Sequence, residues 1–251
     1  MTYSIVAKDP ETGDFGVAVA SRFFAVGMLV PHLRGGACAV ATQAFVNPLW
    51  GIEAADRLAL GEDPGVVIAD LVARDGGQAI RQIHMIDAEG RIGQHTGADC
   101  VDWCGHVSAP GVSVAGNMLA AGAVIQATLA AYQAHMHLPL AERLMTAMEA
   151  GAAAGGDKRG TQSAALVINK GEAYPWLDLR ADDHPDPLAE LRRLYDVAHE
   201  RFVYVAAAMP TRDNFSGVTE RGGIDTAIRA ADTARKAAGV PSRSFATDLE
   251  E

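Results

Sequence analysis

The sequence predicts an α+β fold, because pairs of strand-like segments alternate with pairs of helix-like segments along the chain. The strand-like segments are apolar and occur as hairpins, and each group of them is followed by two segments with helical spacing. This order indicates stacked layers rather than a parallel, doubly wound sheet. A four-layer αββα sandwich fits the pattern, and a three-layer α+β arrangement is the alternative.

The first fifth of the chain is predicted to be a sheet. Residues 3–7 (YSIVA) and 15–21 (FGVAVAS) flank a turn that is rich in Pro, Gly and Asp, which indicates a hairpin. Residues 26–33 (VGMLVPHL) and 37–45 (ACAVATQAF) form a second strand pair around an Arg-Gly-Gly turn. In residues 15–21 the alternation of Val and Ala indicates small side chains between layers.

Two helices are predicted next. In residues 47–61 the apolar side chains recur every three or four positions, which is typical of a helix with one buried face. Residues 63–77 form the second helix, with Asp63 as its N-cap and Pro64 at its first position.

The rest of the chain repeats the order of sheet and helices. Strands are predicted at 80–90, 91–97 and 105–119, helices at 123–136 and 138–156, strands at 163–170 and 174–183, and a helix at 184–208. The predicted domains are 1–208, which holds all strands, and a C-terminal helical extension, 209–251, whose alanine-rich helix lacks a strong apolar stripe.

Composition excludes several classes of function. The chain has 251 residues and a formal net charge of −10, so its field repels phosphate backbones and anionic membranes. No apolar run is long enough to span a bilayer and the N-terminus lacks the pattern of a signal peptide, so a cytoplasmic protein is expected, with no nucleic-acid or membrane partner. An odd number of cysteines indicates reduced thiols. Cys100, Cys104 and His106 lack a second ligand pair, so no metal is predicted.

Thr2 is the candidate nucleophile. Methionine is normally removed when the next residue is small, and removal of Met1 would make Thr2 the first residue. An N-terminal threonine carries a hydroxyl nucleophile and an α-amine base on one residue. The amine has an ordinary pKa of roughly 7.7 to 8.0, which suits it to accept the hydroxyl proton. A position at the start of a core strand would hold this pair rigidly.

The opening of the chain, with its leading Thr and a second strand that ends in Ser-Arg, resembles that of the N-terminal-nucleophile (Ntn) hydrolases, which include proteasome β-subunits. Longer segments, among them TYSIVAKDPETGDFGVAVASRFFAVG, GACAVATQAFVNPLWG, VAGNML, GGDKRGTQSAAL and LDLRADDHPDPLAELRRL, resemble the family known as domain of unknown function 1028. That family is described as Ntn-hydrolase-like, and the resemblance runs from residue 2 to about 195. It implies an αββα sandwich of the Ntn-hydrolase type with Thr2 as the nucleophile.

The chain departs from the proteasome-like pattern at two charged positions. Ala20 stands where that pattern has an Asp before Ser-Arg, and no lysine lies between Lys8 and Lys158. The α-amine of Thr2 is therefore the expected base. Arg22 and Arg34 are the nearest cations in the sequence, and each is either a substrate-binding residue or an ordinary ion-pair partner on the surface.

Asn47 and Asn117 are candidate donors to an oxyanion, because each follows a strand-like run at a junction where backbone N–H groups point outward. For Asn47 an N-cap ahead of Pro48 is the favoured interpretation. For Asn117 the catalytic role is favoured, since Gly116 permits close approach.

Two further segments carry charged candidates. The loop GGDKRGTQSAA is either a flexible connection or a loop that presents Asp157, Lys158, Arg159 and Ser163 to the site, where Lys158 or Arg159 could bind a substrate carboxylate. The segment LDLRADDHPDP either binds a divalent cation or, as we favour, ends a strand, sends Asp182 or Asp183 toward the cleft and caps the next helix with Asp186. The histidines in strands and helices, including His84, are assigned no role.

The leading hypothesis is a cofactor-independent amidohydrolase that attacks a small or peptide-like amide with Thr2. The alternative is a catalytically inactive Ntn-fold protein that binds or senses a ligand. A nucleophile at Ser4 or Cys38 is a weaker third hypothesis, because neither has a base nearby in the sequence. Stacked sheets with apolar helices often associate, so a homo-oligomer is also an expectation.

Overall fold

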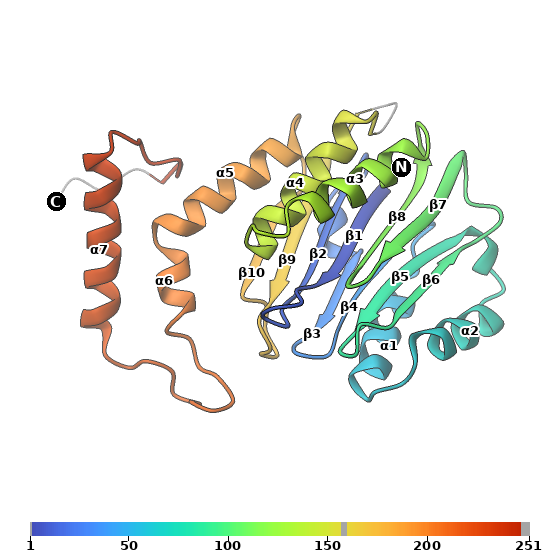
Figure 1. Cartoon of the computed structure of the whole chain (residues 1–251), viewed down its shortest axis with the longest axis horizontal. Coiled ribbons are helices and arrows are strands. Elements are labelled where there is room, and N and C mark those ends of the chain that lie inside the picture. The colour runs from blue at the N-terminus through green and yellow to red at the C-terminus, as the bar shows by residue number, and fades with distance from the viewer. Residues whose placement is uncertain (1, 157–159, 247–251) are drawn as a thin grey trace. The chain divides into compact units, whose positions relative to one another are not determined.

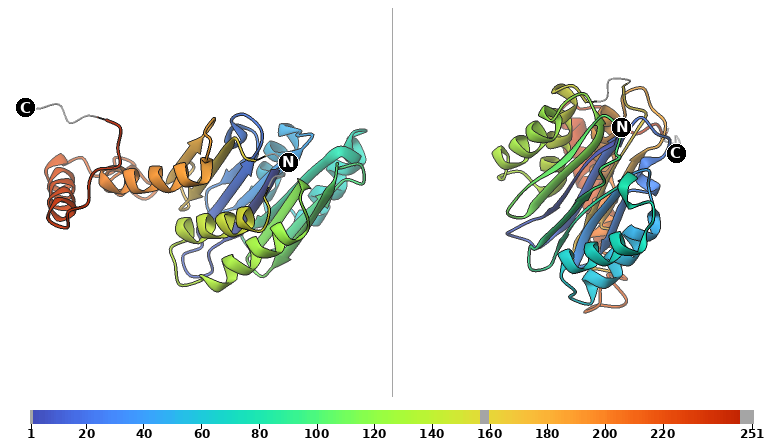
Figure 2. Two further views of the ribbon diagram at one scale, coloured as in Figure 1. Left: turned by 90° about the horizontal axis from the view of Figure 1, so that it is seen from above. Right: turned by 90° about the vertical axis from the view of Figure 1, so that its right-hand side faces the viewer.

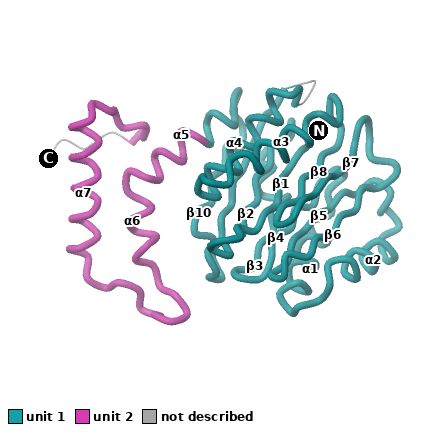
Figure 3. Tube along the Cα trace, in the orientation of Figure 1, with its two compact units in different colours: residues 1–191 teal, residues 192–251 magenta. Residues whose placement is uncertain are grey.

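The structure is a computed structural model that describes residues 2–156 and 160–246. Helices and antiparallel sheets make it an α+β protein, as the sequence predicts. The chain forms two compact units, Met1–Leu191 and Arg192–Glu251 (Figure 3). The boundary between these units lies before residue 208, because the second part of helix α5 (Pro187–Glu200) packs with the rest of the C-terminal unit. The assignment of 209–251 as a separate extension stays a prediction.

A six-stranded antiparallel sheet holds the N-terminal strand near its centre. The order is β10-β9-β2-β1-β8-β7, so β1 has a strand on each side. The strands are β1 (Thr2–Lys8), β2 (Phe15–Ser21), β7 (Trp103–Ala109), β8 (Val112–Leu119), β9 (Ser163–Asn169) and β10 (Leu177–Ala181).

A second, four-stranded antiparallel sheet has the order β3-β4-β5-β6. Its strands are β3 (Pro31–Arg34), β4 (Cys38–Ala44), β5 (Arg81–Asp87) and β6 (Ile92–Thr96). One face of each sheet contacts the other sheet, chiefly through β1 with β4 and through β5 with β8 (Figures 1 and 2). An apolar cluster fills much of this contact, and it includes Val6, Val17, Val19 and Ile86.

Each sheet carries two helices on its other face. Helices α3 (Ala123–Ala134) and α4 (Leu140–Ala153) pack on the six-stranded sheet (Figure 1). Helices α1 (Pro48–Ala59) and α2 (Pro64–Arg74) pack on the four-stranded sheet. Asp63 caps α2 and Pro64 occupies its first turn, as predicted.

Strand alternation in β1 directs Thr2 toward the second sheet. Successive side chains point to opposite faces of a strand. Tyr3 faces the helices, since its hydroxyl donates to the carbonyl of Met148 in α4 at 2.8 Å. Thr2, Ser4 and Val6 therefore face the four-stranded sheet, where Ser4 and Val6 are fully buried.

The strand predicted at 26–33 is wrong in its first half. Val26–Met28 form a 3₁₀ turn, and the strand begins at Pro31. Ala25 enters the turn with φ of 52°, in the left-handed region, and the N–H of Val26 donates to the Ser163 hydroxyl instead of a strand neighbour. The turn shapes the wall of the candidate site described below.

The helix predicted at 184–208 is interrupted. It forms α5 (Pro187–Glu200) and α6 (Phe202–Ala206), with Arg201 between them at φ −145° and ψ −46°. The residues after the break, FVYV, are aromatic or β-branched and have low helix propensity. The last helix, α7 (Arg221–Ala237), has no buried residue and contacts α6 within the C-terminal unit.

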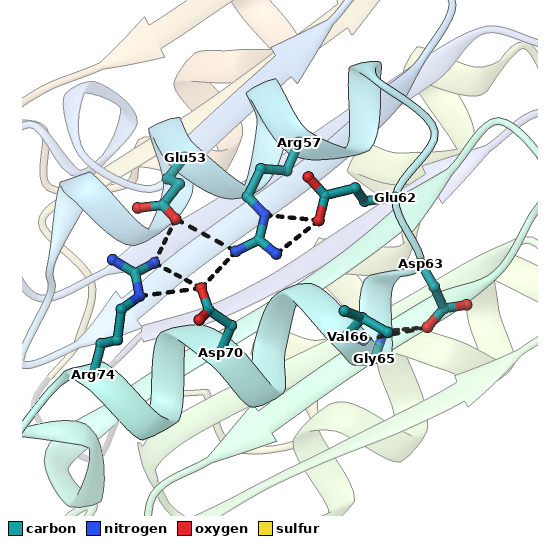
Figure 4. A network of polar contacts seen from close by, with 8 residues as sticks. All are labelled: Glu53, Arg57, Glu62, Asp63, Gly65, Val66, Asp70 and Arg74. Carbon is teal, nitrogen blue, oxygen red and sulfur yellow. Dashed lines mark hydrogen bonds and ion pairs between the residues drawn. The ribbon is translucent and has the colours of Figure 1, made fainter.

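A network of ion pairs joins α1 to α2 (Figure 4). The Arg57 guanidinium contacts Glu62 and Asp70, each at 2.7 Å, and Glu53 at 3.4 Å. Arg74 completes the network through Glu53 and Asp70. The side chains are partly exposed, so each pair alone contributes little.

Replacing Arg57 with glutamine should lower the free energy of unfolding by about 1 kcal/mol, because three carboxylates lose their shared partner. The loss should shrink when salt is added. Arg34→Gln, which removes one exposed pair with Asp56, is the matched control and should change stability by less than about 0.5 kcal/mol. Urea unfolding at low and high salt measures both, and equal losses for the two variants would contradict the network interpretation.

Candidate active site

Thr2 lies at the end of β1 between two strands that hold it on both sides. In the sheet register it is opposite Ser21 of β2 and Asn117 of β8. Its hydroxyl is 2.9 Å from the Ser21 hydroxyl, and either oxygen can donate. Thr2 retains 9 % exposure. A nucleophile at this position would be rigid and still reachable.

A cavity of about 220 Å³ opens beside Thr2. Its polar lining comes from Thr2, Ser21, Gln43, Asn117 and the exposed Arg22. Its other walls are mainly apolar and are formed by Phe23, Val26, Leu29, Val30, Ala44, Val46 and Met118. The chain therefore places the candidate nucleophile against a space that a small ligand could fill.

Two residues of the cavity wall have left-handed backbone conformations. Ala44 has φ of 70° and Met118 has φ of 55°, values that residues with a Cβ rarely adopt. Hydrogen bonds hold the backbone at these positions. The N–H of Met118 donates to the carbonyl of Val101 at 3.1 Å, and the N–H of Phe45 donates to the carbonyl of Ile80 at 3.2 Å. Such strain tends to collect at functional sites, which supports a functional cavity.

A buried amide cluster fixes Gln43 and Asn117. The side-chain oxygen of Gln82 accepts hydrogen bonds from the Gln43 amide at 2.8 Å and the Asn117 amide at 2.9 Å. The Gln82 amide nitrogen in turn donates to the carbonyls of Gly105 and Gly116. All three side chains are at least 98 % buried, so these bonds hold the two cavity-lining amides in one orientation.

The cluster continues to His84. Ser4 donates its one proton to the Gln43 side-chain oxygen at 2.7 Å. The 2.8 Å contact between Ser4 Oγ and His84 Nε2 therefore requires Nε2 to donate. His84 Nδ1 then accepts from the Ser113 hydroxyl at 2.9 Å. The pattern assigns His84 as a neutral imidazole with its proton on Nε2. Burial, with a smaller contribution from His106, lowers the pKa of His84 to about 3.

His84 should make the protein less stable in mild acid. Below its ordinary pKa of 6.5 the unfolded chain binds a proton that the folded chain rejects down to about pH 3. The free energy of unfolding should therefore fall by about 1.4 kcal/mol for each pH unit within this window, whereas above pH 6.5 neither state binds the proton and His84 causes no loss of stability.

The variant His84→Gln should flatten this part of the pH profile, at a cost in stability at pH 7. His137→Gln, at an exposed position, is the control for removal of one imidazole. Urea unfolding between pH 4 and pH 8 measures the slope, and an unchanged slope in His84→Gln would refute the assignment.

The structure brings some of the predicted site residues to Thr2 and leaves others elsewhere. Asn117 and Arg22 line the cavity. Asn47 caps α1, accepting from the N–H of Leu49 at 3.1 Å, and Arg34 pairs with Asp56 at 2.6 Å. Neither lines the cavity, so the structural interpretations of both residues describe them better.

The acidic segment is held by partners within the protein. Asp182 pairs with Arg180 at 2.9 Å and does not line the cavity, whereas Asp183 accepts from Gln162 and Asp186 caps α5. Among residues 2–156 and 160–246, no group of three or more His, Cys, Asp or Glu side chains is arranged to hold a metal ion. Asp157, Lys158 and Arg159 lie outside the described residues.

Ser21, Gln43 and Gln82 belong to the candidate site but are not predicted from the sequence. One signal could have found Gln82 and His84: they are two residues apart in an apolar strand, so both polar side chains lie on one buried face. Gln43 carries a similar signal, as a buried polar residue in an otherwise small and apolar strand.

The Cys38 thiol does not compete with Thr2 as a nucleophile. Cys38, Cys100 and Cys104 are free. Burial raises the pKa of the Cys38 thiol to about 11, and the thiol donates to the carbonyl of Ala55. A thiol this hard to ionise is a poor nucleophile at neutral pH. Ser4 is fully buried and its proton is committed to Gln43, so it is also a poor candidate.

Comparison with known proteins places the chain in a family. The fold and the site together define a class of protein: an α+β protein with a threonine at the end of a central strand, beside a cavity. The model of the family of unknown function DUF1028 matches residues 2–191, and the chain belongs to that family. No curated protein matches it. Within the described residues, no helix is both apolar and long enough to cross a membrane.

Eleven chains of solved structures match this chain, among them the following two. The crystal structure of protein SPO2555 from Silicibacter pomeroyi, assigned to the same family, is 31 % identical, with a TM-score of 0.81, and the match covers 87 % of this chain and 99 % of that one. Anbu (ancestral beta-subunit) from Yersinia bercovieri is 13 % identical, with a TM-score of 0.37, and the match covers 83 % of this chain and 98 % of that one.

Proposed function

We propose that the protein is a cofactor-independent amidohydrolase with an αββα sandwich of the Ntn-hydrolase type, in which Thr2 becomes the N-terminal nucleophile when Met1 is removed. The observation that carries the proposal is the position of the Thr2 hydroxyl, at the end of a central strand and in the lining of a cavity. The helices on the outer faces of the two sheets agree with that architecture.

In the proposed reaction the α-amine of Thr2 takes the proton of its own hydroxyl, and Oγ1 attacks the amide carbonyl of the substrate. The tetrahedral intermediate collapses as the ammonium returns the proton to the leaving amine, which leaves an ester on Thr2. Water, activated by the same amine, attacks this ester and releases the acid. The Ser21 hydroxyl, 2.9 Å from Oγ1, would donate to the developing alkoxide.

Asn117 is the proposed donor to the oxyanion. Its side-chain amide carries two N–H groups, of which one donates to Gln82 and fixes the orientation of the other. The adjacent Gln43 amide is held by Gln82 in the same way. Arg22 is the proposed substrate-binding cation, and it lines the cavity from an exposed position. A cytoplasmic location and a homo-oligomer remain predictions.

Acylation by p-nitrophenyl acetate tests the proposal without knowledge of the natural substrate. Intact-mass analysis should show loss of Met1 and, after reaction, one acetyl adduct that peptide mapping assigns to Thr2 and that hydroxylamine removes, as expected for an ester and not for an amide on the α-amine. Thr2→Ala keeps a small second residue, so Met1 is still removed and the α-amine remains, and it should form no adduct that hydroxylamine removes. Retention of Met1, or equal labelling of the variant, would overturn the proposal.

The second candidate is a binding or sensing protein that lacks the reaction. One observation favours it: among the described residues, Arg22 is the sole charged side chain that lines the cavity, so no carboxylate or lysine assists Thr2 there. Retention of Met1 would block the α-amine and leave this candidate.

A further inference from the structure

We propose that the cavity beside Thr2 binds an uncharged apolar group of about the size of a leucine or phenylalanine side chain. The substrates would then be amides that carry such a group on the acyl side, next to the scissile carbonyl. This inference rests on the proposed hydrolysis by Thr2, and it replaces the broader expectation of any small or peptide-like amide.

The walls of the cavity are mainly apolar. Val26 and Val30 are only 2 % and 3 % exposed, and with Leu29 they come from the 3₁₀ turn that follows β2 and the residues just after it. Val46 and Met118 extend the apolar wall. A charged group placed against these side chains would lose its hydration without compensation, whereas an alkyl or aryl group would gain from burial.

The polar side chains beside Thr2 already have hydrogen-bond partners within the protein. The Thr2 and Ser21 hydroxyls are paired, and the Gln43 and Asn117 amides both donate to Gln82. These contacts provide positions for a reacting carbonyl, but they leave no buried charge to neutralise a carboxylate or an ammonium on the substrate.

Arg22, the charged residue in the lining of the cavity, lies on the side that faces solvent. Arg22 is exposed, and it also lines a polar groove together with Asp183, His184 and Asp186. Its position suits the polar part of a bound substrate that extends out of the cavity into solvent, rather than the apolar group that contacts Val26 and Val30.

The size of the cavity sets the size of the group. An engineered apolar cavity of about 150 Å³ holds a benzene molecule. The cavity at Thr2, about 220 Å³, is larger. An isobutyl or benzyl group therefore fits, together with the carbonyl that must reach the Thr2 hydroxyl.

Binding of two amides that differ in charge tests the inference. The probes are 4-methylpentanamide, which carries an isobutyl group, and glutaramate, which is of similar length and ends in a carboxylate. Protein with ¹³C-labelled methyl groups reports the site directly, because Val26, Leu29, Val30, Val46 and Met118 supply methyl resonances. We expect these resonances to shift with 4-methylpentanamide, and its affinity to exceed that of glutaramate by about tenfold or more. Equal or tighter binding of glutaramate would overturn the inference.

A pair of neighbouring variants locates the binding. Leu29→Trp fills the cavity and should weaken binding of 4-methylpentanamide at least about tenfold. Met28→Trp makes the same change one residue earlier, at a side chain that is 62 % exposed and does not line the cavity, and it should bind as the wild type does. Circular dichroism checks that both fold. Equal binding by both variants would place the ligand elsewhere and refute the inference.

The experiment separates the inference from the proposed function. Binding of a simple amide needs no hydrolysis and is measured equally well on Thr2→Ala. Selective binding without acylation of Thr2 would overturn the hydrolase and retain the ligand class of the cavity. Acylation of Thr2 with faster hydrolysis of glutamyl than of leucyl amides would retain the hydrolase and overturn the inference.

Discussion

Thr2→Ala should lower the rate of amide hydrolysis by a factor of about 10³ or more, because the variant loses the atom that forms the acyl-enzyme. The α-amine, the cavity and the removal of Met1 all remain, so the loss would report on the hydroxyl alone. Turnover of the p-nitroanilide of 4-methylpentanoic acid, followed by absorbance, measures the effect.

Two further variants define the role of the hydroxyl pair. Thr2→Ser keeps the nucleophile and should retain most of the activity. Ser21→Ala removes the hydroxyl that lies 2.9 Å from Oγ1 and should reduce turnover by about tenfold. All three variants should unfold within about 1 kcal/mol of the wild type, since the pair is a single neutral hydrogen bond. Activity of Thr2→Ala equal to that of the wild type would exclude Thr2 as the nucleophile.

The strands around Thr2 could be predicted because their signals are local. Alternating small apolar residues and a short Pro- and Gly-containing turn define the β1–β2 hairpin, and two N-caps followed by prolines define the starts of α1 and α2. The turn at Val26 could not be predicted in this way. Its geometry depends on a hydrogen bond to Ser163, which is 137 positions away in the chain.

The sequence predicts Asn117 as an oxyanion donor but assigns no role to Gln43 or Gln82, for a related reason. Asn117 stands at a recognisable strand end, whereas Gln43 and Gln82 lie inside buried strands of the other sheet. Only the packing of the two sheets brings their amides to Asn117 and Thr2. Long-range packing of this kind leaves no spacing pattern in a single sequence.

Ala20 shows how the register changes the meaning of a residue. From the sequence alone, Ala20 is interpreted as the loss of a carboxylate that would assist the nucleophile. In the sheet it is paired with Tyr3, whose side chain faces the helices, so Ala20 also faces the helices. A carboxylate at position 20 would point away from Thr2. Its absence is therefore weak support for an inactive protein.

A buried ion pair should dominate the effect of single substitutions on stability. Asp9, in the turn after β1, pairs with Arg143 of α4 at 2.9 Å, and their side chains are only 7 % and 4 % exposed. Arg143→Met should lower the free energy of unfolding by about 3 to 5 kcal/mol, because it leaves the Asp9 carboxylate buried and without its cation. Urea unfolding at pH 7 measures the loss. Arg74→Met, at a half-exposed site, is the control.

The Asp9–Arg143 pair also makes the free energy of unfolding depend on pH, in a more acidic range than the one in which the effect of His84 begins. Burial by itself would raise the pKa of Asp9, but the N–H groups of Thr12 and Glu11 and the Arg143 guanidinium outweigh it, so the pKa lies below its ordinary value. The stabilisation is present above the ordinary pKa of about 4 and is lost as the pH falls below it. Asp9→Asn should remove this slope below pH 4 and leave the slope between pH 4 and pH 6.5 that His84 produces.

A double-mutant cycle distinguishes the pair from two independent effects. Asp9→Asn and Arg143→Met each leave one buried group without its partner, whereas the double variant leaves neither charge behind. The double variant should therefore lose less stability than the sum of the two single losses, by about 1 to 3 kcal/mol. Additive losses would show that the two side chains stabilise the protein separately. In that case the contact between the β1–β2 turn and α4 would rest on packing, and on the bonds that Arg143 also makes to the carbonyl of Leu138.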